Sequence, residues 1–155
     1  MTTPLKQQTR SDYAHFLSIP TRWMDNDIYG HVNNVNYYSF FDTALNRYLI
    51  DADALDIHNG TTVGFVVETQ CQYFAPIAFP DTVHAGIRVA QLGNRSVRYE
   101  VGLFRNDDPT PAAAGHFVHV YVDRASNQPV TIPDNARAAM QALQQPTPLK
   151  QGAPS

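Results

Sequence analysis

Two carboxylates and a glycine lie just ahead of a helical pattern in the first third of the chain. Asp25 and Asp27 are followed by Gly30, and Asn33 and Asn34 stand where a helix can begin. The first turn of a helix leaves backbone N–H groups unpaired and carries the positive end of the helix dipole. A carboxylate beside such donors suits acyl chemistry, because the donors stabilise the oxyanion formed when a carbonyl is attacked.

The same spacing allows two structural interpretations. Asp25-x-Asp27-x-x-Gly30 resembles the start of a calcium loop, but Tyr29 and Asn36 occupy positions where such a loop needs ligands, so calcium is excluded. Asp27 can also be a turn carboxylate that accepts a hydrogen bond from its own backbone, with an asparagine capping the helix. Spacing alone leaves this structural role and the catalytic one open.

Composition narrows the class of protein. The chain has 155 residues, 43% of them hydrophobic, and a net charge of −3, which indicates one globular domain without a broad basic face. We therefore expect neither a nucleic-acid nor a membrane partner. Cys71 is the single cysteine and no secretory signal is evident, so a cytoplasmic location is expected. His116 and His119 are three residues apart in a strand pattern and point to opposite faces, so no metal site is expected.

Segments with the periodicity of a helix and segments with the periodicity of a strand are expected to position these residues. We expect a single domain over residues 13–143, between a flexible N-terminus (1–12) and a flexible tail (144–155). Helical spacing predicts one long helix from Asn33 or Asn34 to about Ile50, apolar around enough of its girth to be enclosed. Strand patterns cover 13–23, 63–73, 82–92, 96–104 and 113–123, and a short helix covers 134–143.

Four consecutive strands after the helix favour an antiparallel sheet with the helix against one face. The chain is therefore expected to be α+β, in the order β-α-β-β-β-β with a short C-terminal helix. In the strand after the helix, strict alternation places one set of residues on one face and the polar set on the other. The first set is Val63, Phe65, Val67, Thr69, Cys71 and Tyr73; the second is Glu68, Gln70 and Gln72.

The segment Arg22-Trp23-x-Asp25-x-Asp27-x-x-Gly30-His31-Val32-Asn33-Asn34-x-x-Tyr37 resembles the signature of hotdog-fold acyl-CoA thioesterases of the 4-hydroxybenzoyl-CoA thioesterase type. Later segments fit that family in order, so the resemblance covers about residues 13–143. They include Tyr73-Phe74-Ala75-Pro76, Leu92-Gly93-Asn94-Arg95-Ser96-Val97 and Pro129-Val130-x-Ile132-Pro133. The resemblance implies a curved antiparallel sheet wrapped around one long central helix. It also implies a homodimer with active sites between subunits, often assembled into a homotetramer.

The resemblance implies specific roles for the opening segment. Asp27 matches the family's catalytic carboxylate, which acts as nucleophile or general base, and Gly30 permits the turn that brings it towards the helix. The backbone N–H of Asn34 would polarise the thioester carbonyl. The implied reaction is hydrolysis of an acyl-CoA, or of an acyl carrier protein thioester, with coenzyme A as part of the substrate and no cofactor. The alternative is a non-catalytic hotdog module that binds acyl-CoA.

Five further residues are candidates for substrate binding. Tyr37 can line an acyl pocket or fill the core. Glu68 and Thr69 lie on the strand where some branches of the family place a polar residue near the thioester. Arg95 and Arg98 follow a turn and are candidates for the phosphates of coenzyme A, since arginine supplies nearly all the positive charge of this chain.

Overall fold

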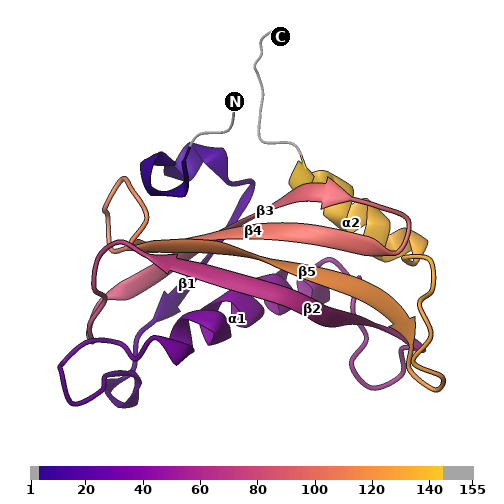
Figure 1. Ribbon diagram of the computed structural model, residues 1–155, viewed down its shortest axis with the longest axis horizontal. Coiled ribbons are helices and arrows are strands. Elements are labelled where there is room, and N and C mark those ends of the chain that lie inside the picture. Colours follow the sequence, from indigo (N-terminus) through magenta and orange to yellow (C-terminus); the bar gives the residue numbers. More distant parts are fainter. Residues whose placement is uncertain (1–3, 145–155) are drawn as a thin grey trace, which may run out of the picture.

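A computed structural model describes residues 4–144 of the chain (Figure 1). The predicted order of elements is confirmed, and most predicted ends agree within two residues. The elements are β1 (His15–Pro20), α1 (Val35–Asp51), β2 (Thr62–Tyr73), β3 (Thr82–Leu92), β4 (Ser96–Arg105), β5 (Ala113–Asp123) and α2 (Asp134–Gln144). The first strand is shorter than predicted, because the chain turns into a 3₁₀-helix at Trp23–Asp25.

The five strands form one antiparallel sheet in the order β1-β3-β4-β5-β2. The long helix α1 lies across one face of this curved sheet, as Figure 1 shows. Alternate residues of β4 are buried on that side, including Tyr99 and Val101, and α2 completes the layer through a hydrogen bond from Tyr48 Oη to the Ala139 carbonyl (2.8 Å). The α+β hotdog architecture expected from the sequence is therefore confirmed.

The long helix is less enclosed than its composition indicated. One face is buried in the core, but Val35, Tyr38 and Ile50 on the other face are exposed. A single sheet covers only one side of a helix, so an apolar residue on the second side stays in contact with solvent in one chain. The buried face consists of Tyr37, Phe40, Phe41, Ala44, Leu45 and Leu49.

The alternation predicted for β2 is wrong at its centre. The pairing of β2 with β5 shifts between Val66 and Glu68, which leaves Val67 as the extra residue of a bulge. Because one extra residue reverses the faces of all residues beyond it, Phe65 shares a face with Glu68 rather than with Thr69. The residues of β2 on the α1 side are therefore Gly64, Val66, Thr69, Cys71 and Tyr73.

The residues before β1 carry more structure than the sequence indicated. Two 3₁₀-helices, Leu5–Gln7 and Arg10–Asp12, lead into Tyr13, whose ring lies over Gly102 on the sheet face opposite α1. A Cβ on Gly102 would come within 2.7 Å of that ring, so glycine is needed for the close approach. The predicted C-terminal tail lies outside the described residues, except for Gln144, which ends α2. No helix in residues 4–144 is long and apolar enough to cross a membrane.

Candidate active site

Asp25 is the structural anchor of the loop between β1 and α1. Its carboxylate is 2% exposed and accepts hydrogen bonds from the backbone N–H of Arg22 (2.7 Å) and from the Arg22 guanidinium (2.8 and 3.1 Å). Its backbone carbonyl accepts from the N–H of Asn33 (2.9 Å) and from Nδ2 of Asn36 (3.1 Å). The loop is thereby tied to the start of α1, and Asp25 has no oxygen free for chemistry on a substrate.

Asp27 occupies a tight turn and keeps part of its carboxylate free. Oδ1 accepts a hydrogen bond from the N–H of Tyr29 (2.9 Å), while the Asp27 carbonyl accepts from the N–H of Gly30 (3.0 Å). The N–H of Asp27 in turn donates to the His31 carbonyl (2.9 Å). The turn role that spacing allowed is therefore present, yet Oδ2 has no hydrogen-bond partner within residues 4–144. Gly30 has a φ of +83°, a conformation that glycine adopts without strain.

The N-terminus of α1 offers one unused donor. Oδ1 of Asn33 accepts from the N–H of Val35 (3.0 Å), and the Asn33 carbonyl accepts from the N–H of Asn36 (2.9 Å). Asn33 therefore caps the helix, and the side chain of Asn34 makes no capping hydrogen bond. The backbone N–H of Asn34 has no acceptor among the described residues. Tyr73 at the end of β2 donates its Oη to the Asn34 carbonyl (3.2 Å), which fastens β2 to this helix end.

A hollow of about 370 Å³ opens beside Asp27. It is lined by Trp23, Asn26, Asp27, Ile28 and Gly30, so the single chain does not bring Asn34 into the same hollow as the carboxylate. Trp23 and Ile28 are among the most exposed large apolar side chains of the protein. Apolar side chains grouped in this way around a carboxylate are typical of a surface that another molecule covers.

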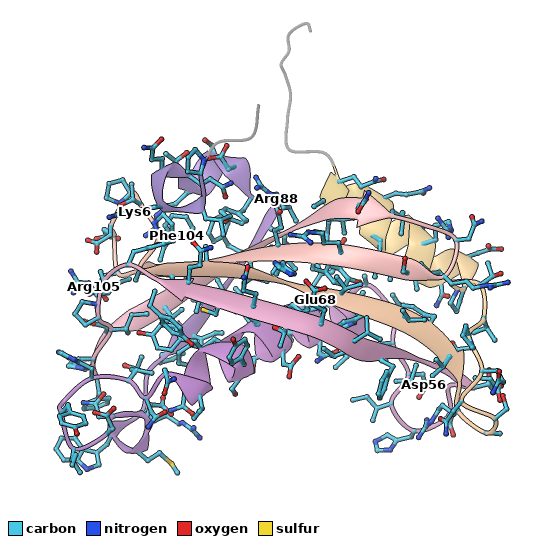
Figure 2. The ribbon with its side chains drawn as sticks, in the orientation of Figure 1. Lys6, Asp56, Glu68, Arg88, Phe104 and Arg105 are labelled. Carbon is cyan, nitrogen blue, oxygen red and sulfur yellow. The ribbon has the colours of Figure 1, made fainter. Side chains whose placement is uncertain are left out.

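Three of the predicted substrate-binding residues lie away from this hollow. Tyr37 is in the core, 3% exposed, with its ring edge against Tyr73. Thr69 faces the middle of α1 and donates to the His116 carbonyl (3.2 Å). Glu68, labelled in Figure 2, is on the opposite face of the sheet. Its Oε2 lies 2.6 Å from Nε2 of His116. The bulge in β2 is the cause, since it separates Glu68 from the α1 side.

The two predicted phosphate ligands lie at the far end of the sheet from Asp27. Arg95 is in the turn between β3 and β4, exposed, and its guanidinium has no partner in the described part of the chain. Arg98 lies on the face opposite α1, with Nη2 3.2 Å from Nδ1 of His116 and Nε 4.0 Å from Glu100. The Asp27 loop contacts the start of β3, so the length of that strand, about 35 Å, separates the two regions.

Sequence reasoning missed a second hollow on the α1 side. This hollow of about 380 Å³ lies between the C-terminal half of α1, residues 55–57, the start of β2 and the end of β5. His119 lines it, is 6% exposed, and burial lowers its pKa to about 4. His119 lies between Phe117 and Tyr121 in the every-second-residue pattern of β5, and this pattern could have identified it as an inward-facing histidine. No three His, Cys, Asp or Glu side chains of residues 4–144 converge as a metal site would require.

Comparison with known proteins decides the family. A model of the thioesterase-like superfamily matches residues 21–140, which is most of the chain and includes the whole Asp27 loop. The chain belongs to the thioesterase-like superfamily. Its members are thioester hydrolases, and this thioesterase carries their hotdog fold.

Solved structures and a curated protein are similar to this chain over most of its length. The PA5185 protein from Pseudomonas aeruginosa strain PAO1 is 57% identical, with a TM-score of 0.86 over 88% of this chain and 95% of that chain. A thioesterase from Thermus thermophilus, solved with coenzyme A and zinc, is 30% identical, with a TM-score of 0.70 over 85% and 95% of the two chains. The YsmA protein of Bacillus subtilis (strain 168) is 22% identical over 86% of this chain and 90% of its own.

Proposed function

We propose that this thioesterase hydrolyses an acyl-CoA to a carboxylic acid and free coenzyme A, with Asp27 as the catalytic carboxylate. The observation that carries the proposal is the half-free carboxylate of Asp27 in an open hollow, at the loop that leads into α1. Membership of the family and the coenzyme A bound to the Thermus thermophilus relative support the substrate class.

The proposed chemistry uses the atoms that have no hydrogen-bond partner in the described residues: Oδ2 of Asp27 and the backbone N–H of Asn34. Oδ2 of Asp27 either attacks the thioester carbonyl or removes a proton from a water that does so. The oxygen joins the acyl carbon, the C–S bond breaks, and the thiolate of coenzyme A leaves and takes up a proton. When Asp27 is the nucleophile, the product of this step is a mixed anhydride, and a water then hydrolyses it to the carboxylic acid and restores the carboxylate. The unpaired N–H of Asn34 is suited to the developing oxyanion, and one such donor is typically worth about a hundred- to a thousandfold in rate.

The active unit in this proposal is a homodimer formed along β2. This strand is at the edge of the sheet, is 12 residues long, and exposes Phe65, Val66 and Val67, beside exposed Val35 and Tyr38 of α1. A long apolar edge strand is a template for pairing with another strand. Two β2 strands paired antiparallel about a twofold axis place the start of each beside the end of the other. Because Tyr73 fastens the end of β2 to Asn34, the helix N-terminus of one chain then reaches the partner chain.

The central test is release of free thiol from a panel of short, long, branched and aromatic acyl-CoAs. Asp27→Asn should lower kcat by at least about a hundredfold on the best substrate, because it removes the nucleophile or base. Asparagine can still accept from the N–H of Tyr29, so the turn is kept and the loss reports on the carboxylate. Asp51→Asn, at the exposed end of α1, is the matched control and should retain full activity.

Two outcomes would contradict the proposal. Wild type that releases no thiol from any acyl-CoA, while binding acyl-CoA at micromolar concentration, would favour the non-catalytic module. Asp27→Asn with undiminished activity would show that another group carries the chemistry.

The dimer is tested separately by light scattering of Val67→Asp, at the exposed bulge residue of β2. An aspartate in the middle of β2 should give a monomer without thiol release, since it places two like charges at the paired edge. Gln91→Asp adds the same charge on β3, away from that edge, and should stay dimeric and active.

A further inference from the structure

The hollow beside His119 is a site that the proposed chemistry at Asp27 does not use. Its volume of about 380 Å³ falls within the range of roughly 300–1,000 Å³ typical of small-molecule sites. Most of its wall is apolar, and Leu49, Leu55 and Tyr121 are among the residues that line it. The two charged residues of the lining, Asp56 and Arg124, are exposed and so belong to its mouth. An aliphatic group fits such an interior.

Buried side-chain atoms without a hydrogen-bond partner occur at and next to His119. Within the described residues, two buried side-chain polar atoms lack a partner: Oη of Tyr99 and Nε2 of His119. The two rings are in contact, with centroids 5.4 Å apart. Buried polar groups are almost always hydrogen-bonded, so an imidazole kept in the wall of the hollow with a buried and unpaired Nε2 indicates a role beyond packing.

The second nitrogen of His119 is the one a ligand can approach. Nδ1 also has no partner in residues 4–144, and it lies beside Gly64, which is itself part of the lining. A Cβ at Gly64 would come within 3.1 Å of Nδ1, so glycine leaves this nitrogen uncovered. With a pKa lowered to about 4 by burial, the imidazole is neutral near pH 7 and can hydrogen-bond a neutral oxygen without burying a charge.

The hollow is too far from Asp27 of its own chain to serve it. Its lining includes Leu49, and fifteen residues of α1 separate Leu49 from Asn34, a length of about 22 Å. In the antiparallel β2 dimer, however, the start of β2 lies beside the partner's β2 end and helix N-terminus. The hollow of one chain then lies next to the catalytic loop of the other.

We propose that this hollow binds an aliphatic acyl group whose far end carries a neutral hydroxyl or carbonyl oxygen, and that Nδ1 of His119 hydrogen-bonds that oxygen. His119 is thereby a specificity-determining residue. The inference rests on the proposed thioester hydrolysis for the identity of the ligand, but the binding site lies wholly within one chain.

Binding of uncharged mimics tests the site without catalysis. The probes are four-, six- and eight-carbon aliphatic amides, each compared with the ω-hydroxy amide of the same length. The readout is the imidazole ¹H–¹³C spectrum of labelled protein, with the His119 signal identified by its loss in His119→Phe. One ω-hydroxy amide should shift the His119 signal and bind about tenfold more tightly than its plain counterpart, as a hydrogen bond of about 1.4 kcal/mol requires.

Three variants separate the role of the imidazole from general damage. His119→Phe should bind the two amides equally well, because the wall is then entirely apolar at that point. Gly64→Ala should also lose the preference, since its methyl group covers Nδ1. His116→Gln is the matched control: this histidine is on the other face of the same strand, bonded to Glu68, and should keep the tenfold preference.

Activity then connects the site to the reaction. The ratio of kcat/KM for an ω-hydroxyacyl-CoA to that for the plain acyl-CoA should fall about tenfold in His119→Phe. If wild type releases thiol from acyl-CoAs but binds the ω-hydroxy amide and the plain amide equally well, the proposed binding site is wrong and the hydrolase function stands. If wild type prefers the ω-hydroxy amide but releases thiol from no thioester, the hydrolase function is wrong and the binding site stands. Equal preference in wild type and His119→Phe overturns the role of the imidazole.

Discussion

Buried His119 should make the stability of this thioesterase fall as the pH is lowered from 7 to 5. Burial lowers its pKa from 6.5 to about 4, and the side chain is only 6% exposed. Between these two values the unfolded chain binds a proton that the folded chain does not, so stability is complete above pH 6.5 and is lost as the pH falls towards 4. The full shift corresponds to ~3 kcal/mol, of which about 2 kcal/mol is lost between pH 7 and pH 5.

Urea unfolding of wild type and His119→Phe at the two pH values measures this contribution. The substituted protein can have a different stability at either pH, so the informative quantity is the loss of unfolding free energy from pH 7 to pH 5. That loss should be about 2 kcal/mol smaller in His119→Phe, because the other groups of the chain titrate in both proteins. The rings in contact with His119 are Tyr99 and Phe117, and neither gains or loses a proton in this interval. Equal losses in the two proteins would refute the reasoning.

Two further predictions concern stability. Asp25→Asn should lower Tm by about 4 °C or more, because the carboxylate that pairs with Arg22 is 2% exposed. Asp51→Asn breaks the exposed ion pair with Arg47 and should lower Tm by less than about 2 °C. Gly102→Ala should lower the free energy of unfolding by about 1–3 kcal/mol through a clash with the Tyr13 ring, and truncation to Tyr13→Ala in the same chain should make the glycine substitution nearly neutral. Thermal and urea unfolding of the single and double variants provide the measurements.

The elements of this fold are readable from the sequence because local patterns and tertiary contacts agree. The ends of β3 and β4 could be predicted almost to the residue, because β4 alternates cleanly and the turn Gly93-Asn94-Arg95 separates the two strands. The bulge at Val67 could not be, because it is a property of the pairing between β2 and β5 and leaves no mark in β2 alone. That single residue explains why Glu68 lies on the face opposite the helix.

The candidate site was predictable in part. Spacing identified two carboxylates beside a helix, and the resemblance to a family chose Asp27 over Asp25. The structure supplies the physical difference: Asp25 is buried and fully used by Arg22 and the helix start, while Asp27 keeps one oxygen free. The orphaned His119 could not be foreseen, since the absence of a partner depends on every element packed around the ring.

Three features that look like defects in one chain have a common explanation in a pair of chains. An exposed apolar edge, a donor at Asn34 outside the Asp27 hollow, and an unpartnered histidine about one helix length away would each be costly or idle alone. Antiparallel pairing of β2 covers the first and brings the other two together across the interface. The Val67→Asp monomer separates these claims, because Val67 is the bulge residue of β2 and does not line the hollow. It should keep the tenfold preference for the ω-hydroxy amide while losing thiol release. Loss of both, in a protein that still unfolds cooperatively, would show that the hollow needs the partner chain to form.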